Sequence, residues 1–277
     1  MNVAACLRRD LAERAQKFAL ANALPHSLSY GEAPRVCFSP YEQDLRHGNF
    51  LEASFRAIQS NPDWRRRLEK VHTLGRRSLP QTERGRWMEL DTCASSDALL
   101  MNIFCYPGIA RSQKVRSLLR IQPDSVPKFG YRARVPLANG KFDRTEVDLR
   151  WGNLLVEAKL TESDFQTAKK DGLVRYRDFG DVFDEERLPQ SEDRYLSYQL
   201  IRNVLAAHAL QCSFCVLIDE RRSDLAEAWY ALMRCVKPVE LRTELRILTW
   251  QELAEAAPSK LLFFLDMKYG IRSRRKS

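Results

Sequence analysis

One stretch of the sequence, TEVDLRWGNLLVEAKL at residues 145–160, constrains the fold more than any other. Apolar and polar residues alternate on both sides of Gly152-Asn153, and a two-residue signal of this kind closes tight antiparallel hairpins. When these two residues form the loop, Trp151 faces Leu154, and the pairing of the outer residues follows from that register. The stretch therefore predicts a β-hairpin with one defined register.

This register places Asp148 opposite Glu157 and Glu146 opposite Lys159. Opposed side chains have Cβ atoms about 4.5 to 5.5 Å apart, and like charges there are destabilising. At a separation of roughly 5 Å and an effective dielectric constant near 20, the repulsion is on the order of 3 kcal/mol. A divalent cation with oxygen ligands would relieve it, and Lys159 or Arg150 could supply part of the compensating charge without a metal.

The alternation also assigns each residue to a face. The apolar face, which we expect to pack on a core, holds Val147, Leu149, Trp151, Leu154, Val156, Ala158 and Leu160. The polar face holds Glu146, Asp148, Arg150, Glu157 and Lys159. We expect the polar face to be either a functional cluster or an ordinary solvated strand surface.

Capping signals and periodicity predict the remaining elements. Helices are expected over residues 4–22, 48–59, from Asn61-Pro62 onward, from Ser95 or Ser96 to about 106, and over 111–120. Strands are expected over 129–137, 142–151 and 153–160, then a helix and a loop over 161–189 and a long helix from Ser191 to about 210. A strand at 213–219, a helix at 223–235, a strand at 244–250 and a helix at 258–268 complete the order. This alternation predicts an α/β chain with a mixed sheet flanked by helices.

Asp148, followed on the next strand by Glu157-Ala158-Lys159, resembles the D...(D/E)xK signature of the PD-(D/E)XK nuclease superfamily. Val147 stands where many members carry proline, so the motif departs from the pattern there. The predicted order of elements from residue 95 to about 265 is also similar to the core of that superfamily. The resemblance implies a restriction-endonuclease-like core over 91–277, preceded by a helical N-terminal extension over 1–90.

The resemblance also implies roles for individual residues. Asp148, Glu157 and the backbone carbonyl of Ala158 would bind Mg²⁺ or Mn²⁺, and Lys159 would position or activate the attacking water. A bound divalent cation acts as a Lewis acid and generates a better nucleophile at neutral pH. Glu146 would support Lys159 or a second metal, and a simple cross-strand ion pair with Lys159 is the alternative.

Superfamily members often add an acid from the first core helix. Asp97 is the best candidate here, and Asp91 and Glu89 are the next candidates. An acid in a first helical turn is also favoured by the helix dipole alone, so that alternative stays open.

Gln199 and Arg202 lie three residues apart and share a helix face. They resemble the glutamine-containing helix motif of several nuclease branches, and Tyr195 is expected on the same stripe. The resemblance makes Gln199 a candidate catalytic residue and assigns Arg202, Tyr195 and Arg150 to nucleic-acid contacts. An exposed helix edge is the alternative.

The formal net charge of +9 over 277 residues suits a polyanionic partner such as DNA. Basic residues cluster in segments 63–87, 111–134 and 269–277, although solvated helix faces give similar runs. Seven cysteines, an odd number, indicate a reducing compartment, and no apolar run approaches the roughly 20 residues of a membrane span. We expect a cytoplasmic protein without a membrane partner. The resemblance to defence and repair nucleases implies a bacterial source, and the sequence leaves open whether the chain forms a homodimer.

The sequence gives little support for a cysteine-based metal or redox site or for a nucleotide-binding site. The CxxC spacing of Cys212 and Cys215 falls in an apolar run that predicts a buried strand, and no second CxxC follows it. The sequence contains no Walker loop and no GxGxxG motif. The resemblance to the PD-(D/E)XK superfamily implies a Mg²⁺-dependent DNA nuclease, an endonuclease of the restriction or defence, repair or mobile-element type. The alternatives are an inactive member of the same fold that binds DNA or protein, and an unrelated α/β scaffold.

Overall fold

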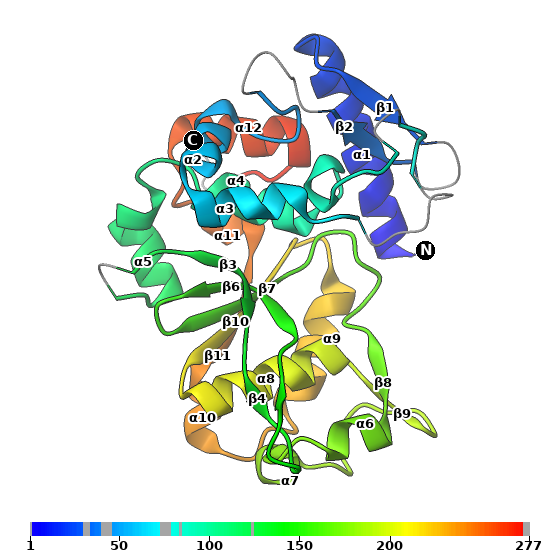
Figure 1. Cartoon of the computed structure of the whole chain (residues 1–277), viewed down its shortest axis with the longest axis vertical. Helices are drawn as coiled ribbons and strands as arrows, with labels where there is room; N and C mark the ends of the chain where they lie inside the picture. Colours follow the sequence, from blue (N-terminus) through cyan, green and yellow to red (C-terminus); the bar gives the residue numbers. More distant parts are fainter. Residues whose placement is uncertain are drawn as a thin grey trace. The chain divides into compact units, whose positions relative to one another are not determined.

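The structure is a computed structural model that describes residues 2–29, 34–39, 46–72, 79–82, 85–122 and 125–273. Parts of the basic segments 63–87 and 269–277 therefore lie outside the described residues. The chain forms two compact units (Figure 1): unit 1 comprises Met1–Pro123 and Thr249–Ser277, and unit 2 comprises Asp124–Leu248. The boundary expected near residue 90 stays a prediction.

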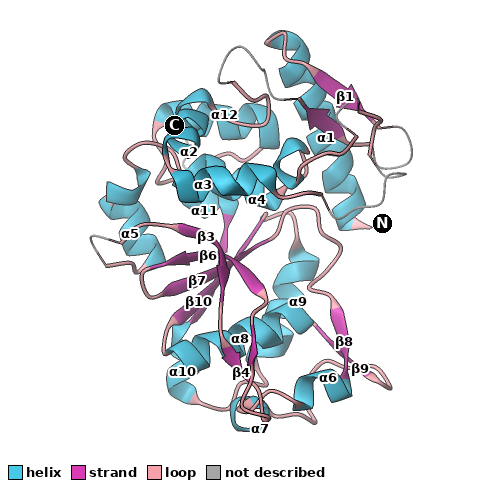
Figure 2. Ribbon diagram, in the orientation of Figure 1, coloured by secondary structure: helices cyan, strands magenta, loops and turns pink. Residues whose placement is uncertain are grey.

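A five-stranded sheet runs in the order β11-β10-β7-β6-β3 (Figure 2). Its strands are β3 (Lys128–Arg132), β6 (Glu146–Trp151), β7 (Leu154–Ala158), β10 (Ser213–Ile218) and β11 (Leu245–Thr249). Strand β6 pairs antiparallel with both β3 and β7, whereas β7 and β10 are parallel. The chain therefore has the predicted mixed sheet, which is flanked by helices. Cys212 and Cys215 are buried free thiols at this sheet.

The hairpin has the predicted register at its turn: Trp151 pairs with Leu154, Arg150 with Leu155 and Leu149 with Val156. The seven residues of the expected apolar face are all buried. In the described hairpin, the ladder ends at Leu149 and Val156, so the two outer pairs that we expected do not form. Beyond that point the backbone N–H of Ala158 donates to Asp148 Oδ2 at 2.7 Å, and a side chain takes the place of a backbone acceptor.

The part of the polar face that lies on β7 and directly after it is buried. Helix α8 (Tyr198–Leu210) packs against β7 and β10, and Leu155 belongs to the same core cluster as the apolar residues of α8. As a result, Glu157 is 2% exposed and Lys159 is 5% exposed. The alternative of an ordinary solvated strand face is therefore wrong for these two residues.

The segment before α8 differs from the prediction. The expected long helix does not begin at Ser191: Arg194–Leu196 form β9, which pairs antiparallel with β8 (Thr167–Lys169). The chain turns at Ser197, whose φ of 58° lies in the left-handed region, and α8 starts one residue later. The other elements of unit 2 are β4 (Val135–Pro136), β5 (Phe142–Asp143), α6 (Lys170–Val174), α7 (Phe179–Val182), α9 (Ser223–Met233) and α10 (Val239–Glu244).

Unit 1 is mainly helical. Its helices are α1 (Val3–Ala21), α2 (Glu52–Ser60), α3 (Pro62–Arg65), α4 (Ser96–Phe104), α5 (Gln113–Leu119), α11 (Trp250–Ala254) and α12 (Ser259–Tyr269), with 3-10 helices η1 (Arg66–Glu69), η3 (Glu89–Asp91) and η4 (Ile109–Arg111). Strands β1 (His26–Leu28) and β2 (Val36–Phe38) pair antiparallel. Among the described helices, none combines the length and the apolar character that a bilayer crossing requires.

Two of the predicted helix caps are confirmed. The Asn61 side chain accepts hydrogen bonds from the backbone N–H groups of Asp63 and Trp64 and so caps α3. Ser95 accepts from the N–H of Ala98 and caps α4. Both side chains satisfy backbone donors that have no partner within the first turn of a helix.

Lys268 of α12 is buried in the core of unit 1. Its Nζ donates to the carbonyl oxygen of Gly48 at 3.1 Å and to Asn49 Oδ1 at 2.5 Å. Four aromatic rings surround it, with centroids between 4.6 and 5.9 Å from Nζ: Phe18, Phe38, Phe264 and Tyr269. Burial lowers the pKa of Lys268 well below its ordinary value, and Cys93 only partly opposes this effect. The contacts join α12 to the first part of the chain.

This burial predicts a pH dependence of stability. An unfolded lysine titrates near pH 10.4, so at pH values between the lowered folded pKa and about 10.4 the unfolded chain binds more protons. Stability should therefore rise with pH in that window, by up to about 1.4 kcal/mol per pH unit. Lys268→Met removes this contribution. Urea unfolding at several pH values should show the wild-type free energy of unfolding rising relative to that of the variant, and parallel curves would contradict the prediction.

Candidate active site

A buried ion pair lies at the carboxyl end of β7. Lys159 Nζ donates to Glu157 Oε1 at 2.8 Å, and the two side chains are 6% and 3% exposed. Residues two apart on a strand point to the same face, so the sequence spacing itself brings the two groups together. Because water is largely excluded, the local interaction is stronger than that of a surface pair.

The second oxygen of Glu157 is held by α8. Asn203 Nδ2 donates to Glu157 Oε2 at 2.8 Å, and the Asn203 side chain is fully buried. Both oxygens of Glu157 therefore have defined partners. Sequence analysis missed Asn203, although a polar residue four positions after Gln199, on the same helix face, was an available signal.

The charges of three carboxylates act on the Lys159 ammonium group. Burial alone would lower the pKa of Lys159, but Glu157, Glu162 and Asp148 outweigh it and hold the pKa above its ordinary value. Glu162 was not among the predicted residues; its Oε2 accepts a hydrogen bond from the Leu160 N–H at 2.6 Å. Asp148 is half-buried and accepts from the N–H of Ala158. The structure thus brings Asp148, Glu157, Ala158 and Lys159 together.

Helix α8 contributes a second group of polar atoms. Gln199 Oε1, Arg202 Nε and Asn203 Oδ1 are buried and lack a hydrogen-bond partner among the described residues. Arg202 Nη2 donates to the carbonyl oxygen of Glu146 at 2.9 Å, which ties α8 to the first residue of β6. Arg202 is only 2% exposed, so the alternative of an exposed helix edge does not describe it.

Two further predicted residues of unit 2 lie in other surroundings. Tyr195 is on β9, not on the α8 stripe, and its ring packs edge-on against Phe179 with centroids 5.5 Å apart. The reason is that the left-handed turn at Ser197 starts the helix later than we expected. Arg150 donates to the Tyr131 hydroxyl at 2.5 Å and lies over the Tyr131 ring at 4.7 Å.

The three candidate acids of the first core helix and its approach belong to unit 1. Asp97 forms an ion pair with Arg67 Nη2 at 2.5 Å, Glu89 pairs with Lys70 at 2.8 Å, and Asp91 contacts His47 Nε2 at 3.0 Å. A role for Asp97 in the site stays a prediction, as does the role expected for the Glu146 carboxylate.

The oxygen atoms at the end of the hairpin are ligands of the kind that a hard divalent cation prefers. Mg²⁺ takes oxygen ligands, is usually bound by one or two carboxylates and keeps several water molecules. Asp148, Glu157 and the Ala158 carbonyl are such donors, and the unpartnered oxygens of Gln199 and Asn203 are acceptors that water would satisfy. In the described part of the chain, no group of three or more His, Cys, Asp and Glu residues could hold a metal ion. Two carboxylates and one backbone carbonyl nevertheless fit a Mg²⁺ site in which water supplies much of the coordination.

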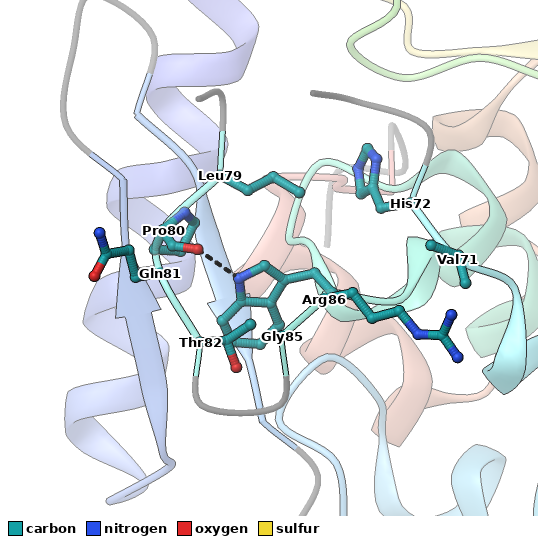
Figure 3. A pocket seen from close by; sticks show the side chains of 9 residues that line it. Val71, His72, Leu79, Pro80, Gln81, Thr82, Gly85 and Arg86 are labelled. Atoms are coloured by element: carbon teal, nitrogen blue, oxygen red, sulfur yellow. Dashed lines mark hydrogen bonds between the residues drawn. The ribbon is translucent and has the colours of Figure 1, made fainter. Parts of the chain in front are cut away.

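A separate pocket lies in unit 1, and Figure 3 shows the side chains around it. It has a volume of about 490 Å³, and its lining includes Trp87, whose Nε1 donates to the carbonyl oxygen of Pro80 at 2.8 Å. The described lining residues are Val71, His72, Leu79, Pro80, Gln81, Thr82, Gly85, Arg86 and Trp87. These described lining residues include no carboxylate, so they supply no hard anionic ligand of the kind found at the β7 site.

Comparison with protein families adds an independent finding. Residues 21–270 match the family described as restriction endonuclease associating with ARP. The chain belongs to this family. Searches of curated proteins and of solved structures gave no match. The family assignment supports a restriction-endonuclease-like chain with a nuclease-like function and DNA as the partner that such a function implies.

The buried pair predicts an asymmetric response to mutation. Lys159→Met leaves Glu157 without its cation and should cost about 3–5 kcal/mol of stability, whereas neutralising both residues removes the uncompensated charge. The double variant Glu157→Gln/Lys159→Met should therefore be more stable than Lys159→Met alone. Chemical denaturation measures both, with Lys141→Met at an exposed position as the control, expected within about 0.5 kcal/mol of wild type. A double variant less stable than Lys159→Met would contradict the interpretation.

Proposed function

We propose that this chain is a Mg²⁺- or Mn²⁺-dependent nuclease of the PD-(D/E)XK superfamily that hydrolyses phosphodiester bonds in DNA, acting as an endonuclease. The observation that carries the proposal is the convergence of Asp148, Glu157 and Lys159 at the end of one hairpin. The restriction endonuclease family match supports it. The net charge of +9 favours association with a polyanion.

In the proposed mechanism, the side chains of Asp148 and Glu157 and the Ala158 carbonyl would hold the cation. When bound, Mg²⁺ supplies a Lewis acid and favours ionisation of water at neutral pH. Lys159, oriented by its contact with Glu157, would stabilise negative charge on the attacking water and the phosphate. Phosphodiester hydrolysis depends mainly on positioning and charge stabilisation, so this apparatus is sufficient.

Partners beyond DNA follow from the family. Its description names association with ARP, and we infer the same association for this chain. The homodimer suggested by the sequence remains a prediction, which the mass of the protein in solution would test.

A second candidate function has an observation in its favour. The Lys159 ammonium contacts Glu157 directly and interacts electrostatically with Glu162 and Asp148, so it neutralises part of the charge that a metal ion would otherwise compensate. An inactive member of the fold that binds DNA would keep such an arrangement. This reading predicts DNA binding that weakens steeply with salt, with no cleavage in any divalent ion.

Cleavage assays on supercoiled and linear DNA test the proposal. Asp148→Ala and Glu157→Gln remove metal-binding oxygen charge and should each lower the Mg²⁺-dependent rate at least about a hundredfold. Glu192→Gln, an exposed acid in the same unit, serves as the control and should cleave at the wild-type rate. Circular dichroism checks the fold of each variant. Full activity in the folded Asp148→Ala protein would overturn the assignment.

A further inference from the structure

Three buried polar atoms without partners belong to residues on one face of α8. Gln199 Oε1, Arg202 Nε and Asn203 Oδ1 come from positions separated by three and four residues, which share a face of α8. A buried polar atom without a partner costs about 1–3 kcal/mol. Such atoms are uncommon in folded proteins, and a group of three on one face calls for a ligand or ordered water.

The orientation of the Asn203 amide is dictated by its neighbour. An ionised carboxylate only accepts hydrogen bonds, so the amide nitrogen must face Glu157 Oε2, as the 2.8 Å contact shows. The opposite orientation would place two oxygens against each other. The Asn203 oxygen is therefore turned away from Glu157 and remains a buried acceptor because of the chemistry of the pair.

The cost of this arrangement argues against a purely structural role. Residues Leu200, Ile201, Val204 and Leu205 around Asn203 belong to the apolar core of unit 2. Leucine at position 203 would add apolar burial and remove the unpaired oxygen of Asn203. Asparagine contributes instead a directed donor to one oxygen of Glu157.

We propose that Asn203 is a positioning residue: it orients Glu157 for cation binding, and its free oxygen, together with that of Gln199, accepts hydrogen bonds from water held at the site. This inference rests on the proposed function. Partners that orient metal-binding side chains typically change metal affinity or activity about 10- to 100-fold when they are removed. Asn203 acts through Glu157 and takes no part in the chemical step.

The test is Mn²⁺ binding to the full chain without DNA, measured by titration calorimetry. Loss of the binding heat in Asp148→Ala assigns it to this site. Asn203→Leu should weaken Mn²⁺ binding about 10- to 100-fold and raise the Mn²⁺ concentration needed for half-maximal cleavage by a similar factor, with the KM for DNA unchanged. Gln211→Leu makes the same amide-to-leucine change at the exposed end of α8 and should bind Mn²⁺ as wild type does.

The outcomes separate this inference from the proposed function. Wild-type Mn²⁺ affinity in a folded Asn203→Leu protein would overturn the inference and leave the nuclease proposal standing. Weakened binding in this variant, in a chain that cleaves no DNA, would support the positioning role and overturn the nuclease activity. A wild-type chain that neither binds Mn²⁺ nor cleaves would overturn both. If Asn203→Leu does not fold, Asn203→Ser takes its place, with weaker Mn²⁺ binding again expected and unchanged binding overturning the inference.

Discussion

The hydrogen bond from the Ala158 N–H to Asp148 Oδ2 lies just beyond the last backbone pair of the β6–β7 hairpin, Leu149 with Val156. Strand β7 keeps its parallel pairing with β10 through Ala158, and the N–H of Lys159 donates to the Leu217 carbonyl at 2.8 Å. The end of β7 is thus fixed by backbone on one side and by a carboxylate on the other. Groups presented from such a strand are held more rigidly than groups on a loop.

This anchoring gives the charges around Lys159 a fixed geometry. A buried ion pair contributes little net stability, because desolvation of the two charges offsets their attraction. The burial of Glu157 and Lys159 against α8 is therefore better explained by a role in the proposed site than by a gain in stability. Helix α8 is attached to the hairpin through two polar contacts, from Asn203 to Glu157 and from Arg202 to the Glu146 carbonyl. A shift of the helix should therefore change the position of the Glu157 carboxylate.

The sequence predicted what local chemistry determines. Gly152-Asn153 defined the hairpin register near the turn, and Asn61 and Ser95 marked two helix starts, because turns and caps depend on neighbouring residues. The start of α8 was predicted wrongly because Ser197 adopts a left-handed conformation. Glycine is the usual sequence signal for that conformation, and this position has serine instead. The contact of Asn203 with Glu157 joins residues 46 positions apart, and only the packing of α8 on the sheet creates it.

The division of the chain has a consequence for biosynthesis. Unit 2 is continuous in sequence, whereas unit 1 needs both the first part of the chain and α12, which carries Lys268 into its core. Domains usually fold in the order in which the ribosome releases them. Here the helices that precede unit 2 in the sequence must wait for α12 to be translated before the core of unit 1 is complete. The central sheet of unit 2 can form before then.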